Sequence, residues 1–361
     1  MQSPAHVSKV IISVISLQWA LAAFSRTIIL SIQHFILLMF SESSFNPAWW
    51  LKNPHLQTIA AKVFRRNHTL DTITETLELP DGDFVDLAWT EKVNQSCSRP
   101  IITVLHGLEG SKNSHYARGM LSAIKAQGWI GVLMHFRGCS GRPNRMAHSY
   151  HSGQTCDVDY FSQYLANHYP TAKKAIVGFS LGGNVLAKYL AEQTQNIYQA
   201  AGVICAPLDL SSCCERIDQG FSRVYQKYLV DMLKTSTLEK IAANLLTSVN
   251  KANLNNVRSI RDFDQIVTAP INGFQDADDY YQQASGRDGL QKITTPTLII
   301  HASDDPFLCH KNITAISTLP KHVTFEVSGR GGHVGFISGR NPFKPQYWLE
   351  QRIPEFFTRY L

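Results

Sequence analysis

Five short, unbroken apolar segments separated by stretches of helical character constrain the fold of this 361-residue chain more than any other feature. An unbroken apolar strand is buried on both faces, as in a parallel sheet covered by helices. Strands and helices in alternation predict a doubly wound α/β sheet. The apolar segments are 101–105, 130–136, 175–179, 201–205 and 297–300, and helical stretches lie at about 114–127, 155–168 and 181–195.

An antiparallel hairpin is expected ahead of these segments. Residues 74–79 and 84–89 alternate between apolar and polar side chains, and the turn residues Pro80 to Asp83 separate them. The whole pattern therefore predicts a mostly parallel sheet with an antiparallel start.

The alternation stops between Pro207 and about Leu290. Helix formers and aromatic residues gather there in 221–233, 238–246 and 277–283, and no strand-like run interrupts them. Because open α/β sheets bind ligands at the C-terminal ends of their strands, an insertion at this point would lie over the site. We expect a helical cap over about 208–290. The alternative is a helical subdomain that only extends the fold.

A G-x-S-x-G motif follows one of the buried strands. The apolar strand 175–179 leads into Ser180, which has Gly178 and Gly182 on its two sides, and a helix follows. This arrangement is typical of a nucleophile elbow, a turn so tight that larger flanking side chains would collide. We therefore expect Ser180 to be a nucleophile. The N–H of the next residue, Leu181, is the first expected donor of an oxyanion hole.

A serine nucleophile requires a base and an acid, in the chain order serine, acid, histidine for this fold. The last apolar strand ends at Asp304 and Asp305. We choose Asp305 as the acid because it directly precedes the turn at Pro306, and we expect Asp304 to brace the loop. The base is predicted to be His333, in a glycine-rich loop that lets an imidazole approach the serine. His301, at the strand end, is the rival base.

The loop after 101–105 is expected to supply the second oxyanion donor. It runs from His106 to Gly110, and by position the N–H of Leu108 is the best candidate. We expect His106 to brace this loop. Arg137, which follows another strand, is expected to brace its own loop, with recognition of an anionic substrate as the alternative.

No metal or cofactor is expected. His148, His151, Asp157 and Asp159 match no ligand spacing, and a serine triad needs no metal. The net charge of +6 is scattered among acids, which disfavours a nucleic-acid partner. Seven cysteines without a CxxC pair predict free thiols in a reducing compartment, and thus a cytoplasmic protein.

The N-terminus carries two apolar runs, 10–24 and 27–40. Neither reaches the roughly 18–20 uninterrupted apolar residues of a membrane-spanning helix. They are compatible with a membrane anchor, with the core of a cleaved signal peptide, or with translation that begins at Met39. We expect residues 1–45 to be an extension outside a domain of residues 46–361, and the choice between anchor and misassigned start stays open.

Spaced motifs across residues 46–361 resemble the YheT-like hydrolases, whose eukaryotic relatives include membrane-associated phospholipases. The resemblance implies carboxylic-ester hydrolase activity, with Ser180, Asp305 and His333 at the positions of the family's nucleophile, acid and base. Its bacterial-type members imply a cytoplasmic enzyme. The matching stretches are 53–58, 79–84, 106–110, 136–141, 331–336 and a spaced pattern from Asp264 to Asp305.

The leading hypothesis is a serine esterase that forms an acyl-enzyme on short- to medium-chain or lipid-like esters. Aromatic residues in the insertion suit an apolar acyl chain, although such residues also pack helices together. An acyltransferase with the same triad is the first alternative. A non-catalytic binding protein of the same fold is the second.

Overall fold

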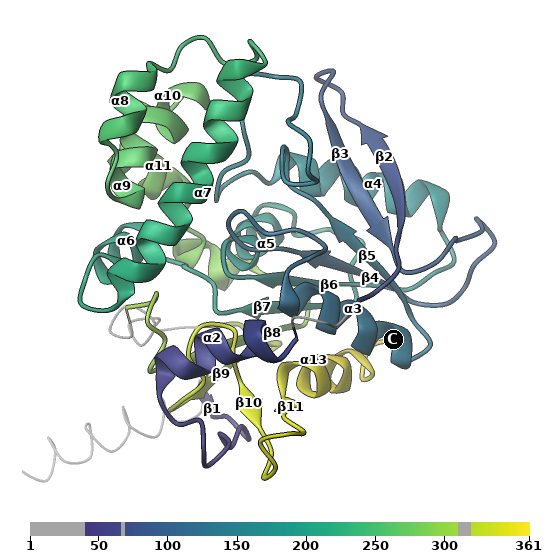
Figure 1. Cartoon of the computed structure of the whole chain (residues 1–361). Helices are drawn as coiled ribbons and strands as arrows, with labels where there is room; N and C mark the ends of the chain where they lie inside the picture. Colours follow the sequence, from purple (N-terminus) through teal and green to yellow (C-terminus); the bar gives the residue numbers. More distant parts are fainter. Residues whose placement is uncertain (1–39, 66–68, 310–318) are drawn as a thin grey trace, which may run out of the picture. The chain divides into compact units, whose positions relative to one another are not determined.

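The computed structural model describes residues 40–65, 69–309 and 319–361 (Figure 1). The chain divides into two units, residues 1–41 and 42–361, and all that follows concerns the second. The apolar run 10–24 lies outside the described residues, and so does 27–40 except for Phe40. In the part of the chain that the structure describes, no helix has both the length and the apolar character needed to cross a bilayer.

The core of the second unit is a twisted sheet with the strand order β9-β8-β7-β6-β4-β5-β3-β2. Strands β4 to β9 pair in parallel, whereas β2–β3 and β3–β5 are antiparallel. The bounds are β2 Ile73–Glu78, β3 Phe84–Trp89, β4 Ile101–Leu105, β5 Ile130–Met134, β6 Lys174–Phe179, β7 Ala200–Ile204, β8 Thr297–Ala302 and β9 Val323–Ser328. The short β1 (Phe40–Glu42) crosses the boundary between the units, and β10 (Ile337–Ser338) and β11 (Gln346–Tyr347) form a separate ribbon.

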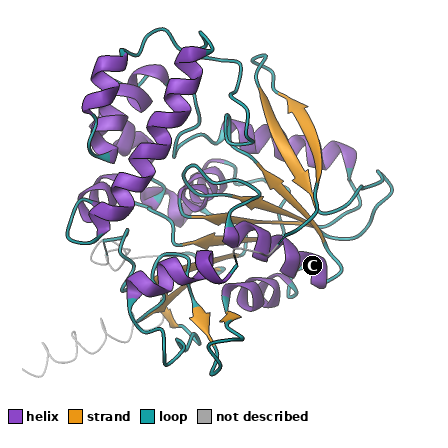
Figure 2. Ribbon diagram, in the orientation of Figure 1, coloured by secondary structure: helices purple, strands orange, loops and turns teal. Residues whose placement is uncertain are grey.

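Helices cover both faces of this sheet, as the purple and orange layers of Figure 2 show. Helices α3 and α13 lie on one face, and α4 and α5 on the other (Figure 1). Every residue of β4, β5, β6, β7 and β8 is buried, which explains their unbroken apolar sequences. The bounds are α2 Pro54–Phe64, α3 His115–Ala126, α4 Cys156–His168, α5 Leu181–Glu192 and α13 Leu349–Phe357. The predicted fold class is confirmed.

Between β7 and β8 the chain forms a group of helices, which we call the insertion. Its apolar side chains form a core of their own around Leu233, Leu254 and Phe263, against which Leu108 also packs. The elements are α6 Leu210–Ile217, α7 Ser222–Ala242, α8 Lys251–Asn256, α9 Ile260–Phe263, the π-helical turn η1 Asp264–Thr268, α10 Ala269–Ile271, α11 Ala277–Ala284 and the 3-10 helix η2 Arg287–Lys292.

Helix α7 runs without a break from the first of the stretches rich in helix formers, 221–233, into the second, 238–246. The residues between them include threonines and a serine, which are weak helix formers. In the helix, the hydroxyls of Thr235 and Thr237 donate to the carbonyls of Asp231 and Leu233 one turn earlier. These bonds satisfy the hydroxyls within the helix, which continues to Ala242.

Candidate active site

Ser180 occupies a strained turn between β6 and α5. Its backbone has φ 53° and ψ −122°, outside the regions that a residue with a side chain prefers. A Cβ on Gly178 would lie 2.3 Å from the carbonyl oxygen of Gly182, so no larger residue fits there. The Ser180 N–H donates to Ile204 O in β7, which ties the turn to the sheet. The elbow predicted from the motif is therefore present.

The three residues predicted as nucleophile, base and acid lie in one hydrogen-bonded row. Ser180 Oγ lies 2.9 Å from His333 Nε2, and His333 Nδ1 lies 2.9 Å from Asp305 Oδ2. In the tautomer with its proton on Nδ1, the imidazole donates to the carboxylate and accepts from the serine. The side chain of Asp305 is fully buried and that of His333 is 13% exposed, so bulk water is largely kept from their contact.

The adjacent carboxylate has a different partner. Asp304 Oδ1 accepts from the N–H of Gly332, the residue before His333. Asp305 Oδ1 accepts from the N–H of Phe307 and is held in its own loop. Asp304 thus braces the histidine loop, in the manner expected from the sequence, and only Asp305 contacts the imidazole.

The start of helix α2 holds the histidine loop from the other side. The N–H of His333 donates to Thr58 Oγ1 at 2.9 Å, and this hydroxyl donates in turn to Pro54 O. Gly332, at φ 58°, passes so close that an added Cβ would lie 2.4 Å from Pro54 O. Sequence reasoning did not assign Thr58 a role, although the stretch 53–58 was among the motifs of the family resemblance.

Gln57 fastens the same helix to the chain beyond the histidine loop. Its amide is fully buried and donates to Leu51 O and Ile337 O, while its carbonyl accepts from Ile337 N. An amide can satisfy both a backbone donor and backbone acceptors, which no apolar side chain can do. Gln57 is the second positioning residue that the sequence did not reveal.

The loop after β4 leaves one backbone donor free beside Ser180. The N–H groups of Gly107 and Glu109 donate to the hydroxyls of Tyr116 and Tyr150, both at 2.7 Å. The N–H of Leu108, between them, donates to no described residue, and neither does that of Leu181 at the start of α5. Both leucines line the cavity in front of Ser180. The two predicted oxyanion donors are thus unoccupied among the described residues, and two tyrosines that the sequence did not single out bind the N–H groups on either side of Leu108.

Two other histidines are buried away from the serine. His106 Nε2 accepts from the N–H of Phe136 and its Nδ1 donates to Gly107 O, while burial lowers its pKa to about 3. It therefore braces the loop as a neutral ring. His301 is fully buried and packs against Phe325, and burial lowers its pKa to about 4. Neither histidine contacts Ser180 among the described residues.

A cavity of about 530 Å³ opens in front of Ser180 and His333 and extends between the sheet and the insertion. Much of its wall is apolar, which suits a ligand with a hydrocarbon part. The apolar residues that the insertion contributes are Leu210, Ile217, Val224, Leu229, Leu233, Leu246, Ile260, Phe263, Val267 and Ile271.

Comparison with known proteins assigns the chain to a family. The α/β hydrolase fold family matches residues 100–340. The chain is 48% identical over 323 residues to the putative esterase YheT of Escherichia coli (strain K12), across 89% of this chain and 95% of the relative. This chain belongs to the YheT-like α/β-hydrolases. The predicted family is confirmed, and with it, at the level of the family, the prediction of a hydrolase.

This YheT-like chain also resembles more distant proteins. It is 26% identical over 285 residues to medium-chain fatty acid ethyl ester synthase/esterase 2 of Saccharomyces cerevisiae, across 72% of this chain and 62% of the relative. Among solved structures, the Pyrococcus furiosus esterase Pf2001 aligns with a TM-score of 0.53 at 15% identity, across 83% of this chain and 92% of that one. The structural likeness shows the fold alone.

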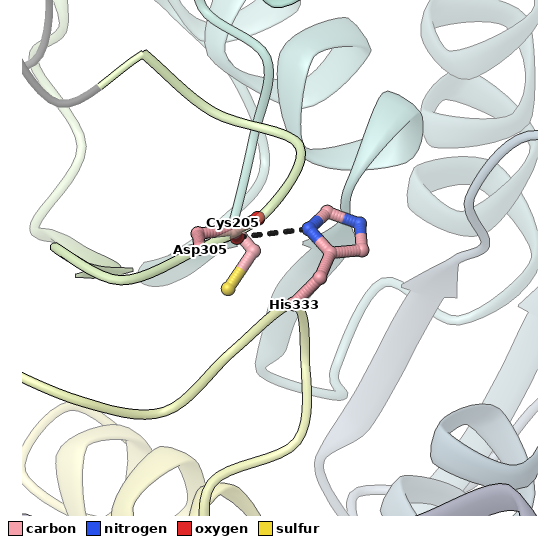
Figure 3. Close-up of side chains that lie close together, drawn as sticks. All are labelled: Cys205, Asp305 and His333. Atoms are coloured by element: carbon pink, nitrogen blue, oxygen red, sulfur yellow. Dashed lines mark hydrogen bonds and ion pairs between the residues drawn. The ribbon is translucent and has the colours of Figure 1, made fainter. Parts of the chain in front are cut away.

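In this YheT-like hydrolase, a thiol lies next to the hydrogen-bonded row of Ser180, His333 and Asp305. Cys205 Sγ, a carboxylate oxygen of Asp305 and a ring nitrogen of His333 all lie within 4.8 Å of one another (Figure 3). Within the described ranges, no other three acidic, cysteine or histidine side chains come together in this way. Burial raises the pKa of Cys205 well above its usual range, so the thiol stays neutral beside the carboxylate.

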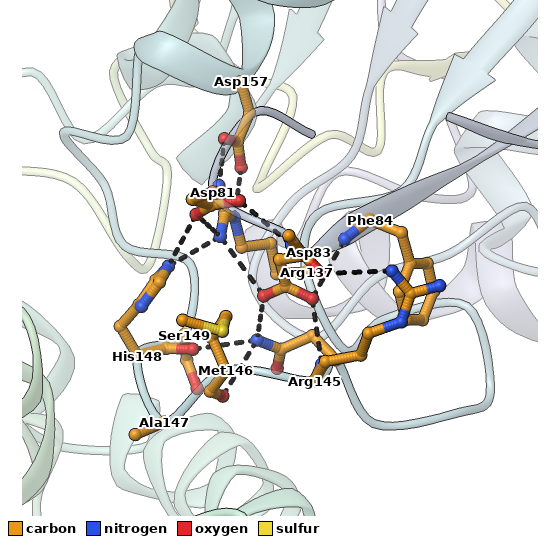
Figure 4. Close-up of polar contacts among 12 residues, drawn as sticks. Asp81, Asp83, Phe84, Arg137, Arg145, Met146, Ala147, His148, Ser149 and Asp157 are labelled. Carbon is orange, nitrogen blue, oxygen red and sulfur yellow. Dashed lines mark hydrogen bonds and ion pairs between the residues drawn. The ribbon is translucent and has the colours of Figure 1, made fainter. Parts of the chain in front are cut away.

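Arg137 lines the cavity and lies in a cluster of charged side chains (Figure 4). Its guanidinium binds both carboxylate oxygens of Asp157, at 2.6 and 2.7 Å, and reaches Asp81 at 2.6 Å and Asp83 at 3.2 Å. Its contact with His148 is 2.6 Å. Because its guanidinium is already paired with carboxylates, Arg137 braces its own loop. Asp157 is one of these ion-pair partners.

Lys240 of α7 connects the insertion to this cluster. Its ammonium donates to the Asn144 side chain, to the carbonyls of Ala147 and His148, and to Ser149 Oγ, at 2.9–3.0 Å. Burial lowers its pKa to about 8. One lysine thus fixes the C-terminal end of the long helix α7 to the loop that follows Arg137.

Proposed function

We propose that this chain is a serine carboxylesterase in which Ser180, His333 and Asp305 form the catalytic triad. The observation that carries the proposal is the continuous row of hydrogen bonds from Ser180 Oγ through the imidazole to the Asp305 carboxylate, 2.9 Å at each step. Its position at the cavity and the unoccupied N–H groups of Leu108 and Leu181 support it. Membership of the YheT-like family supports the same class of reaction.

Acylation begins when Ser180 Oγ attacks the carbonyl carbon of the ester. His333 Nε2 takes the hydroxyl proton, and the Asp305 carboxylate stabilises the resulting imidazolium through Nδ1–H. The tetrahedral intermediate then collapses, the bond to the alkoxy oxygen breaks, and Nε2 returns the proton to the leaving alcohol. A water molecule repeats the sequence on the acyl-enzyme, which releases the carboxylic acid and restores the serine hydroxyl.

Charge on the carbonyl oxygen is stabilised by the N–H groups of Leu108 and Leu181. Donors held in position before the reaction do not have to reorganise as charge develops, and loss of one such donor costs about 10²- to 10³-fold in kcat. The hydroxyls of Tyr116 and Tyr150 occupy the N–H groups on either side of Leu108. They therefore fix the orientation of this peptide without competing for the oxyanion.

The acyl chain of the substrate occupies the apolar part of the cavity, and the insertion, about residues 208–290, acts as its cap. An aliphatic or lipid-like acyl group of short to medium length suits a volume of about 530 Å³ with walls of leucine, isoleucine and valine. The name of the yeast relative, a medium-chain fatty acid ethyl ester synthase and esterase, agrees with this substrate class.

Acyl transfer to an alcohol is the second candidate, and the same relative favours it, because its name includes ester synthesis. The two reactions share the acyl-enzyme and differ in whether water or an alcohol attacks it. Product analysis in the presence of ethanol separates them. Transfer predicts an ethyl ester as the main product, and hydrolysis predicts the free acid.

The test of the triad is labelling with a fluorophosphonate probe, which reacts with activated serine hydroxyls. We expect the wild type to be labelled, Ser180→Ala to be unlabelled and inactive on p-nitrophenyl butyrate, and Ser303→Ala to be labelled like the wild type. Ser303 is the matched control because it lies two residues from the proposed acid and outside the cavity lining. Labelling that persists in Ser180→Ala would refute the proposed nucleophile.

A further inference from the structure

Two helices beside the cavity expose apolar side chains with identical spacing. Leu56, Ile59 and Val63 follow one another along α2 at intervals of three and four residues, and so do Phe221, Val224 and Tyr228 at the start of α7. All six are at least 40% exposed. Intervals of three and four residues place side chains on one face of a helix. Each helix therefore presents an apolar stripe to the outside.

Contacts between the helices join the two stripes into one surface, which we call the entrance face (Leu56, Ile59, Val63, Phe221, Val224 and Tyr228). The ring of His55, at the start of α2, lies 4.7 Å from that of Phe221 and 3.2 Å from the Tyr225 hydroxyl. About two turns further along α2, Lys62 donates to the Tyr228 hydroxyl at 3.2 Å. Both helices are labelled in Figure 1. Contiguous exposed apolar surface of this kind marks an interaction site.

The entrance face continues into the cavity of the proposed active site. Ile59, Val224 and Tyr228 are exposed on the outside and also line the cavity. An apolar path, bordered by polar residues such as Thr58 and Lys62, therefore leads from the surface into the cavity. A ligand with a hydrocarbon chain could pass along it without returning to water.

Charged residues around the entrance face are predominantly basic. Helix α2 contains no acidic residue. Asp218, which precedes α7, pairs with Arg223, and Asp231, near the middle of α7, pairs with Lys227; both cations are exposed. Two more cations lie here, Lys62 in α2 and Lys52 just before it. Among the described residues, neither forms an ion pair with an acidic side chain.

We propose that the entrance face docks this protein on a lipid bilayer that contains anionic phospholipids. The apolar stripes would enter the boundary between headgroups and acyl chains, with both helix axes in the plane of the membrane. Tyr228 suits the headgroup level, and the lysines and arginines would contact lipid phosphates. A bilayer is favoured over a protein partner because the apolar stripe leads into a cavity fit for an acyl chain and its rim is basic. This inference goes beyond the esterase proposal and does not depend on it.

The test is co-sedimentation of the full chain with vesicles of phosphatidylcholine alone and of phosphatidylcholine with 30% phosphatidylglycerol. We expect the wild type to bind the anionic vesicles. The double variant Leu56→Gln, Val63→Gln should bind them about 10- to 100-fold more weakly, since two apolar side chains lose their insertion. Neither residue lines the cavity. The matched control is Ile73→Gln, Met146→Gln, which removes two exposed apolar side chains elsewhere and should bind like the wild type.

A second variant tests the electrostatic part without touching the apolar stripes. Lys227→Glu, at a highly exposed side chain, should weaken binding to the anionic vesicles and leave binding to pure phosphatidylcholine unchanged. All variants keep residues 1–39, so a difference between them reports on the entrance face and not on the N-terminus.

Three results would overturn the proposal. The first is a wild type that stays in the supernatant with both kinds of vesicle. The second is a Leu56→Gln, Val63→Gln variant that binds as tightly as the wild type. The third is light scattering that shows a wild-type dimer which the same variant converts to a monomer, because the face would then join two copies of the chain. Vesicle binding requires no catalysis, so failure of the esterase proposal remains a separate outcome.

Discussion

Replacing Thr58 by valine tests whether helix α2 positions the proposed base. Valine has nearly the same shape as threonine but cannot accept the hydrogen bond from the His333 N–H, which is 2.9 Å from Thr58 Oγ1. The bond to Pro54 O is lost as well. The loop that carries the imidazole would then be held mainly by the contact of Asp304 with the Gly332 N–H.

The size of the effect follows from the cost of an unpaired, partly buried N–H, about 1–3 kcal/mol. The histidine loop can escape this cost by moving, but movement separates Nε2 from Ser180 Oγ. If this free energy is added to the activation barrier, the rate falls about tenfold for each ~1.4 kcal/mol. The expected decrease in rate is therefore about 5- to 150-fold. The loss should appear in kcat, because the hydroxyl acts on the base and not on the binding of the acyl chain.

The assay is steady-state hydrolysis of p-nitrophenyl butyrate, with Thr58→Ser as the matched control. Serine keeps the hydroxyl and both of its hydrogen bonds, so we expect its kcat to stay within about twofold of the wild type. Thermal unfolding of both variants checks that the fold is intact. A Thr58→Val enzyme with wild-type kcat, or a Thr58→Ser enzyme as slow as Thr58→Val, would show that the hydroxyl does not position His333.

Two further predictions concern carboxyl groups. Asp305→Asn should lower kcat by about 10³- to 10⁴-fold and Asp304→Asn by less than about tenfold, because only Asp305 contacts the imidazole; comparable losses in both would contradict the choice of acid. In the insertion, burial raises the pKa of Asp264 to about 6, so between about pH 4 and pH 6 this residue is ionised when unfolded and protonated when folded, and stability falls as the pH rises. Asp264→Asn should therefore gain up to about 3 kcal/mol over the wild type in urea unfolding between pH 4 and pH 7, whereas a difference that does not change with pH would show that the carboxyl is not desolvated.

The parts of this molecule that follow from local sequence are the sheet and the elbow. Strands buried on both faces can be recognised in the sequence as unbroken apolar runs. The G-x-S-x-G motif depends on contacts between residues four apart, such as Gly178 and Gly182. The extent of α7 was harder to foresee. Its middle contains weak helix formers whose hydroxyls are satisfied only once the helix exists.

What local sequence could not reveal is the support around the proposed triad. Thr58 contacts His333 across 275 positions of the chain, and Tyr150 contacts Glu109 across 41. No local periodicity or motif spacing predicts such a long-range contact, because neither partner belongs to a recognisable sequence motif for it. The distinction between Asp304 and Asp305 is of the same kind, because two neighbouring carboxylates differ only in which distant group each one meets.

Helix α2 combines two tasks on opposite sides. At about 100° per residue, Leu56, Ile59 and Val63 lie within about 60° of one another, whereas Gln57 and Thr58 point away from them. The inner side holds the histidine loop, and the outer side forms part of the entrance face. If both assignments hold, substitutions on one side of α2 should affect only hydrolysis and substitutions on the other side only vesicle binding. Thr58→Val should slow hydrolysis of a soluble ester without changing vesicle binding, and Leu56→Gln with Val63→Gln should do the reverse. Were either variant to change both properties equally, α2 would transmit one disturbance to the whole site and the separation of its two sides would be wrong.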